Sequence, residues 1–159
     1  MATKKSSSSK PAAKTAKSKA RAPKARGGAF RLDSLSVSLT VNDIAKSIVF
    51  YRDVLGFSVI QQWVMEGVVR GAELSLGGAS IMIGQDDWKK GRNRKKGEAL
   101  RFYFMTTQDL DVLAAMLKSR GLKLEQEPMT TEWGRHFAFS DPDGFHFTVA
   151  QEAKKKKKK

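Results

Sequence analysis

The stretch SLSVSLTVNDIAKSIVFYRDVLGF, residues 34–57, joins a strand pattern directly to a helix pattern. In residues 34–41, Leu and Val alternate with Ser and Thr, which predicts a strand with one apolar face and one small, polar face. Asn42 or Asp43 can cap a helix after this strand, and Gly56 suits the left-handed conformation that ends one. Between them, apolar residues recur at helical spacing at Ile44, Ile48, Tyr51 and Leu55.

The same order of elements occurs twice. Strand-like runs at 57–65, 68–76 and 79–84 follow the first helix, and a strand at 99–106 then precedes a second helix that ends at Gly121. Three pairs of landmarks keep nearly one offset: Asp43 and Asp109 are 66 residues apart, Gly56 and Gly121 are 65 apart, and Gly78 and Gly144 are 66 apart. A fixed offset indicates an internal repeat, here of a βαβββ unit. We therefore expect an α+β fold in which two such modules pair into a curved, eight-stranded, cup-like sheet, with the helices on the outer face.

Two segments resemble the signatures of one superfamily. LTVNDIAKSIVFYRDVLGF at 39–57 and TEWGRHFAFSDPDGFHFTV at 131–149 are similar to those of the vicinal oxygen chelate superfamily, which includes glyoxalases, bleomycin-resistance proteins and extradiol dioxygenases. The resemblance implies one domain over residues 32–152, with modules at about 32–84 and 99–152 and a basic linker at 85–98. It predicts the fold more strongly than the reaction, because this fold supports many chemistries.

The resemblance also identifies four inward positions where metal-dependent members carry His or Glu. In this sequence they are Ser36, Met82, Phe102 (Arg101 if the alignment slips by one residue) and Thr148. A divalent ion needs carboxylates or imidazoles, which none of these side chains provides. We therefore predict a bleomycin-resistance-like member without a metal site or other cofactor.

The expected cup has polar and aromatic side chains. Trp133-Gly134-Arg135 is similar to a stretch that borders the ligand cleft of bleomycin-resistance-like members, and aromatic side chains suit a flat or apolar ligand. The predicted ligand-binding residues are Ser36, Ser38, Met82, Arg101, Phe102, Tyr103, Trp133, Arg135, His146 and Thr148. Aromatic residues in such a fold are more often part of the core or a dimer interface, and related proteins commonly dimerise and complete their cups across the interface.

Two residues are candidates for catalysis. His146 has the strand parity of Thr148 and can serve as a general base if a neighbour orients it, and Glu73 can face inward as a lone carboxylate. A rim histidine and a surface glutamate are the simpler interpretations, and His136, flanked by phenylalanines, is interpreted as structural. Whether the protein is an enzyme therefore stays open, and binding without catalysis is favoured.

The basic residues are concentrated at the two ends of the chain. The formal net charge is +14, but residues 1–31 hold ten Lys and Arg with no acid, and residues 154–159 are six lysines. The 14 remaining basic residues stand against all 16 acidic ones, so residues 32–153 carry a formal charge of −2.

Both ends are predicted to be disordered basic tails, at 1–31 and 153–159, because their composition buries too little apolar surface to offset the entropy of ordering. Spaced cations bind polyanions such as nucleic acid without sequence preference. The predicted polyanion-binding residues are Lys14, Lys17, Lys19, Arg21, Lys24, Arg26, Lys154, Lys155, Lys156, Lys157, Lys158 and Lys159. A role in solubility is the alternative. The linker segment 86–98, with six Lys and Arg, either grips an anion or is a solvated connection.

The sequence contains no cysteine, no apolar signal segment and no run long enough to span a membrane. We expect a cytoplasmic protein, associated with nucleic acid if the tails bind it, and a homodimer. Three functions remain: a metal-free module that binds a small, partly aromatic ligand; a glyoxalase- or dioxygenase-like lyase or oxygenase with relocated ligands; and a nucleic-acid-associated protein whose core is a dimerising scaffold.

Overall fold

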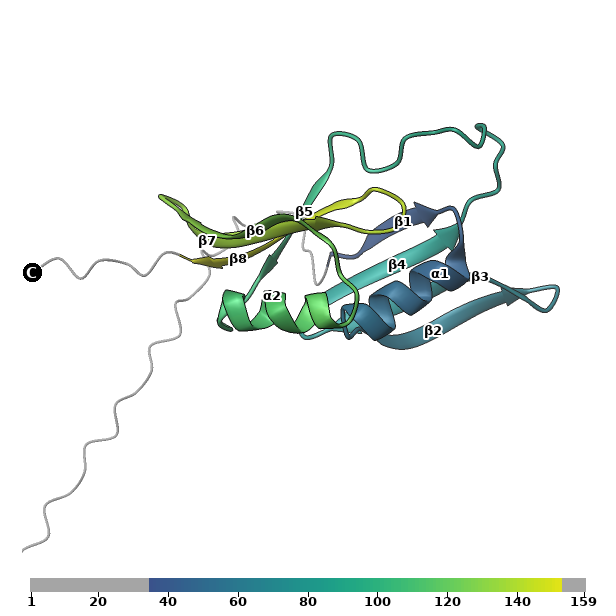
Figure 1. Cartoon of the computed structure of the whole chain (residues 1–159). Coiled ribbons are helices and arrows are strands. Elements are labelled where there is room, and N and C mark those ends of the chain that lie inside the picture. The colour runs from purple at the N-terminus through teal and green to yellow at the C-terminus, as the bar shows by residue number, and fades with distance from the viewer. Residues whose placement is uncertain (1–34, 153–159) are drawn as a thin grey trace, which may run out of the picture. The chain divides into compact units, whose positions relative to one another are not determined.

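The computed structural model describes residues 35–152, so the tail predictions lie outside the described residues. The described chain forms two successive βαβββ modules, as predicted (Figure 1). The N-module contains β1 (Val37–Val41), α1 (Ile44–Val49), a π-helical turn η1 (Phe50–Val54), β2 (Ser58–Met65), β3 (Val68–Leu76) and β4 (Ala79–Gln85). The C-module contains β5 (Arg101–Met105), α2 (Leu110–Ser119), β6 (Leu124–Thr131), β7 (Gly134–Ser140) and β8 (His146–Glu152).

The two helices begin and end at the repeated landmarks. The Asp43 carboxylate accepts a hydrogen bond from the backbone N–H of Lys46 at 3.1 Å, and the Asp109 carboxylate accepts from Asp111 at 2.9 Å. Both are N-caps, which satisfy backbone donors that have no partner within the helix. Gly56 and Gly121 follow the two helices with φ of +86° and +95°, a region that favours glycine. The repeated Asp and Gly residues therefore reflect what each helix needs in order to begin and to end.

Hydrogen bonds divide the eight strands into two sheets of four. The strand order is β1-β4-β3-β2 in one sheet and β5-β8-β7-β6 in the other. In each module the first strand runs parallel to the last, and the other pairings are antiparallel. The modules therefore share one topology, and equivalent strands of the two occupy equivalent positions in their sheets.

One apolar core joins the two modules. It contains buried side chains from both sheets, and the Phe147 ring of β8 lies 6.2 Å from the Tyr51 ring and 5.2 Å from that of Phe104, between centroids. Helix α1 packs on β3 and β4, and α2 packs on β6, β7 and β8 (Figure 1). Each sheet thus turns its apolar face toward the helices and the shared core. We call the opposite face of each sheet its open face.

A buried carboxyl group also links the modules. The Tyr51 hydroxyl donates to the Asp141 carboxylate at 2.8 Å, and the backbone N–H groups of Asp143 and Phe145 each donate to Asp141 at 2.9 Å. Burial raises the pKa of Asp141, although these hydrogen bonds oppose the shift. Burial and the neighbouring carboxylate likewise raise the pKa of Tyr51. The turn before β8 is therefore anchored to the N-module by a carboxylate that forms no ion pair within residues 35–152.

The linker is fastened to the fold by a second buried carboxylate. The Asp86 side chain, 2% exposed, accepts from the backbone N–H of Trp88 at 2.8 Å and pairs with Arg94 and, at 2.7 Å, with Lys96. The Lys96 ion pair, the Trp88 N–H and Arg94 hold the pKa of Asp86 well below its usual range. Three of the six linker cations thus form ion pairs: Arg94 and Lys96 with Asp86, and Lys89 with Asp87 at 3.3 Å.

Candidate ligand-binding site

The register of β5 against β8 decides which predicted site residues share a face. Arg101 lies beside His146 and Tyr103 beside Thr148, and neighbours in register point to the same side of a sheet. These four side chains therefore belong to the open face of the C-module. Phe102 points the other way and stacks on Phe147, with 5.1 Å between ring centroids. Of the two residues predicted for the third inward position, the structure places Arg101 on the open face and Phe102 in the core.

A hollow of about 810 Å³ covers much of this open face. Tyr103 and Trp133 project with 64% and 83% of their surface exposed, whereas Thr148 is buried beneath them in the sheet. The predicted residues in its lining are Arg101, Tyr103, Trp133, Arg135 and Thr148. The other lining residues are Met105, Gln126, Thr131, Gly134, His136, Ala150 and Gln151. The C-module alone thus brings together half of the predicted ligand-binding residues.

Apart from His146, which lies on β8 outside the lining of the hollow, the remaining open-face candidates belong to the N-module. Ser38 lies beside Met82, which in turn lies beside Glu73, so the three share the open face of the N-module. Glu73 accepts a hydrogen bond from the Ser80 hydroxyl at 3.2 Å. Ser36 precedes β1 and is exposed. The two catalytic candidates, Glu73 and His146, are on different sheets.

Trp63 occupies the same N-module open face. A Cβ atom placed on Gly71 would come within 2.7 Å of the Trp63 ring, so the indole lies directly on the glycine backbone. Gly71 is beside Trp63 in register, and the ring remains 39% exposed. The N-module therefore presents an aromatic surface of its own, apart from the C-module hollow.

The inward positions do not fit a metal ion. Ser36, Met82, Arg101 and Thr148 offer hydroxyls, a thioether and a guanidinium, and none of these is a strong ligand for a divalent ion. Within residues 35–152, no three His, Asp or Glu side chains are grouped so that they could hold one.

His146 has two neighbours that orient its ring. Its Nδ1 atom lies 2.8 Å from the Ser140 hydroxyl and 3.3 Å from the Glu125 carboxylate, and Ser140 also donates to Glu125. Because the serine proton is used by Glu125, both groups turn lone pairs toward Nδ1. The neutral ring therefore carries its proton on Nδ1. The hydrogen bond from Ser140, followed by His146, lowers the pKa of Glu125.

This cluster does not have the geometry of a catalytic triad. A triad needs the nucleophile on one ring nitrogen of the histidine and the carboxylate on the other. Here Ser140 and Glu125 both approach Nδ1, so the Ser140 hydroxyl is not activated as a nucleophile. The cluster instead fixes the orientation of the His146 ring, and Glu125 accepts hydrogen bonds from both Ser140 and His146.

Arg135 is held at the rim of the hollow by two hydrogen bonds. Its guanidinium donates to Asp111 of α2 at 2.6 Å and to the Thr130 hydroxyl at 3.0 Å. Arg101, the other arginine in the lining, forms neither an ion pair nor a hydrogen bond with the described residues.

Several lining residues were missed by the sequence analysis. His136 was interpreted as structural, yet it lines the hollow, 3.4 Å from the Gln126 amide nitrogen. Met105 and Ala150 follow Tyr103 and Thr148 by two residues, so strand periodicity alone was enough to find them. Strand periodicity could not place Glu125, the neighbour of His146, because the register of β6 shifts between Leu124 and Gln126.

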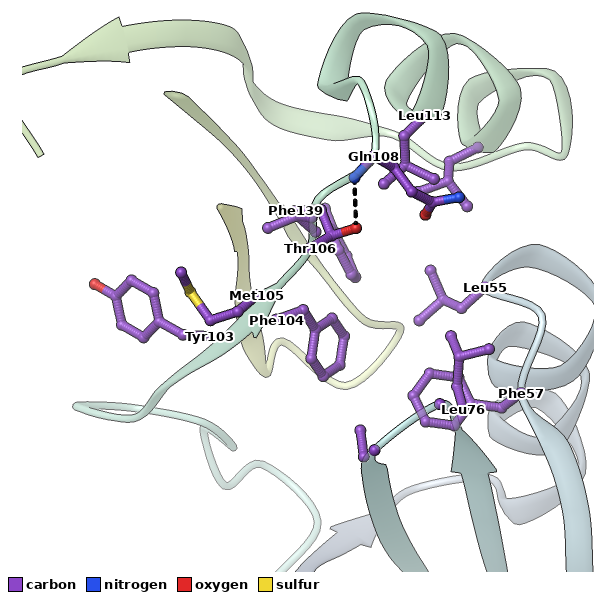
Figure 2. Close-up of a pocket in the computed structure, with 15 residues that line it drawn as sticks. Leu55, Phe57, Leu76, Tyr103, Phe104, Met105, Thr106, Gln108, Leu113 and Phe139 are labelled. Carbon is purple, nitrogen blue, oxygen red and sulfur yellow. Dashed lines mark hydrogen bonds between the residues drawn. The ribbon is translucent and has the colours of Figure 1, made fainter. Parts of the chain in front are cut away.

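A second hollow, of about 470 Å³, lies where the two modules meet. Its lining is mainly apolar and includes Leu55 and Phe57 from the N-module and Phe104 and Phe139 from the C-module. Figure 2 shows Phe104 directed toward Leu55 and Phe57, while Tyr103 points to the opposite side of β5. Phe104 of β5 therefore faces the seam between the modules, while Tyr103 and Met105 contribute to the lining of both hollows.

A protein-family model, the Glyoxalase/Bleomycin resistance protein/Dioxygenase superfamily, matches residues 31–149. The chain belongs to this superfamily, as its two signature-like segments indicated. No curated protein matches the chain.

Solved structures of other members have the same fold. The antibiotic binding protein TnmS3 from Streptomyces sp. CB03234 is 26% identical with a TM-score of 0.61, and the match covers 79% of this chain and 100% of that one. A superfamily member from Sphaerobacter thermophilus is also 26% identical, with a TM-score of 0.60 and coverage of 74% and 94%. A member from Nocardioides is 17% identical with a TM-score of 0.64 and coverage of 82% and 90%, a likeness of fold alone.

Proposed function

We propose that the protein binds a small, partly aromatic molecule on the open face of the C-module and does so without a metal. The observation that carries this proposal is the hollow of about 810 Å³, which combines two exposed aromatic side chains with polar groups. Ligand sites characteristically combine apolar walls with a few fixed polar groups. The similarity to an antibiotic binding protein supports the same class of function.

A second copy of the chain completes the site in this proposal. The predicted cup residues divide between the open faces of two sheets, Ser38 and Met82 on one and Tyr103 and Thr148 on the other. A homodimer in which the N-module face of one copy covers the C-module hollow of the other would reunite them. Trp63 would then become part of the wall of the hollow.

The binding experiment uses full-length protein and a set of flat two-ring aromatic probes, with affinity measured by calorimetry. We expect micromolar to millimolar binding that Trp133→Ala weakens about tenfold, because the ring supplies exposed aromatic contact. Trp88→Phe, a change in the linker, is the matched control and should leave affinity unchanged. If none of the probes binds, the proposal is wrong.

Acid–base catalysis at His146 is the second candidate, because Ser140 and Glu125 orient its ring and leave Nε2 as the basic atom. Turnover of a hemithioacetal or catechol substrate, lost in His146→Gln, would favour an enzyme. The metal content of the protein after incubation with divalent ions and desalting shows whether such catalysis depends on a metal.

The tails form the last part of the proposal, and it is based on sequence alone. We propose that residues 1–31 and 154–159 tether the domain to a polyanion, most simply nucleic acid, and that the protein acts in the cytoplasm. Within the described residues, no helix has the length and hydropathy to cross a membrane. Equal DNA binding at low salt by full-length and tail-deleted protein would overturn the tether.

A further inference from the structure

The C-module hollow has a charged end and an aromatic end. Along β5, Arg101, Tyr103 and Met105 succeed one another on the open face and lie beside His146, Thr148 and Ala150 of β8. At about 3.3 Å per residue, Arg101 and Met105 are separated by roughly 13 Å of strand.

The aromatic end is the one nearer Met105. Gly134 lies beside Glu152 at the far end of β8, so the β6–β7 turn that carries Trp133 belongs to the Ala150 end of the sheet. Ser140 lies beside His146 at the opposite end, next to Arg101. The end nearer Met105 thus carries the indole, the thioether and Arg135, whose guanidinium is paired with Asp111, whereas the other end carries the guanidinium of Arg101.

The guanidinium at the charged end is available to a ligand. Arg101 is exposed and has neither a hydrogen bond nor an ion pair among residues 35–152. Its nearby acid, Glu125, is occupied by the Ser140 hydroxyl and by His146. Asp111 of α2 is paired with Arg135 at 2.6 Å. The charge of Arg101 contributes to the lowered pKa of Glu125, but within residues 35–152 neither acid forms an ion pair with the Arg101 guanidinium, so its N–H donors are free for a ligand.

We propose that this hollow selects aromatic carboxylates, with the carboxylate on Arg101 and the ring system toward Trp133. The proposal rests on the proposed function and adds the charge and orientation of the ligand. A guanidinium presents paired N–H donors that match a carboxylate in a bidentate arrangement, which an amide of the same shape cannot reproduce. Tyr103 lies between the two ends of the hollow, where it would contact the aromatic ring of a ligand with or without a carboxylate.

The test compares two probes of nearly equal shape, 2-naphthoate and 2-naphthamide, by calorimetry at 150 mM salt with the full chain. We expect the carboxylate to bind at least tenfold tighter than the amide. In Arg101→Gln the ratio should fall to about one, while the affinity for the amide changes less than threefold. Arg101→Lys, which keeps the charge but loses the bidentate geometry, should retain part of the preference.

Arg70→Gln is the matched control, since it removes the same charge from β3 of the other sheet and should keep the tenfold ratio. Thermal unfolding monitored by circular dichroism confirms that each variant is folded. Equal affinity for both probes, or a preference that survives Arg101→Gln, overturns the inference and leaves the aromatic site intact. Failure of both probes to bind removes the aromatic site and the inference with it.

Discussion

The N-module and the C-module are alike where they pack together and different where they are open. Each turns an apolar sheet face toward a helix that an Asp side chain caps, and these faces form one core. On the open faces, the N-module presents Trp63 with Met82 and Glu73, whereas the C-module presents Arg101, Tyr103 and His146. The repeated pattern thus preserves what folding requires, and the residues that suit a ligand differ between the copies.

The comparison predicts that the largest loss of stability comes from the shared face. Phe147→Ala removes a ring that packs against Tyr51, Phe102, Phe104 and Phe139, and we expect it to lower the free energy of unfolding by about 3–5 kcal/mol. Urea denaturation measures the change. Trp133→Ala on the open face should cost no more than about 0.5 kcal/mol. Similar losses in the two variants would contradict the division of roles between the faces.

A smaller effect distinguishes the two open faces. In the proposed dimer, Trp63→Ala removes a wall from the partner's hollow, so it should weaken binding of 2-naphthoate several-fold and shift the protein toward monomer. Sedimentation velocity and calorimetry give the two values. Gly71→Ala should act in the same direction, because its Cβ would come within 2.7 Å of the indole. Unchanged affinity and unchanged mass in both variants would limit the site to the C-module of one chain.

The last comparison concerns the two buried carboxylates, one in the linker and one in the turn before β8, whose pH dependences should have opposite signs. Cations lower the pKa of Asp86, so its stabilising contribution is present above the unfolded pKa, about 3.9, and is lost as pH falls. Burial raises the pKa of Asp141, so its contribution is fully present below that value and is lost as pH rises through the folded pKa.

Urea denaturation at several pH values between 3 and 7 measures these effects in Asp86→Asn and Asp141→Asn. The stability difference between wild type and Asp86→Asn should grow with rising pH. The difference between wild type and Asp141→Asn should shrink. Parallel trends in the two variants would show that burial does not dominate at Asp141.

The spacing of apolar residues and the positions of helix-ending glycines were sufficient to predict the helices, the strands and their repetition. Alternation in residues 34–41, helical spacing at Ile44, Ile48 and Tyr51, and glycines at 56 and 121 all reflect constraints that act within a few residues. These constraints led to the correct class of fold and to the shared strand parity of His146 and Thr148. They were not sufficient for Glu125, because a register shift in β6 changes which side of the sheet a residue occupies.

The sequence by itself determined two βαβββ modules and basic ends, since both follow from local pattern, and its resemblance to the superfamily identified four positions whose side chains are not metal ligands. Only the tertiary structure decided that Arg101 rather than Phe102 belongs to the open face, that Ser140 and Glu125 orient His146, and that the predicted cup residues divide between two sheets. Those outcomes depend on register and on which faces pack together. Both are set by the burial of apolar surface between segments that lie far apart in the chain.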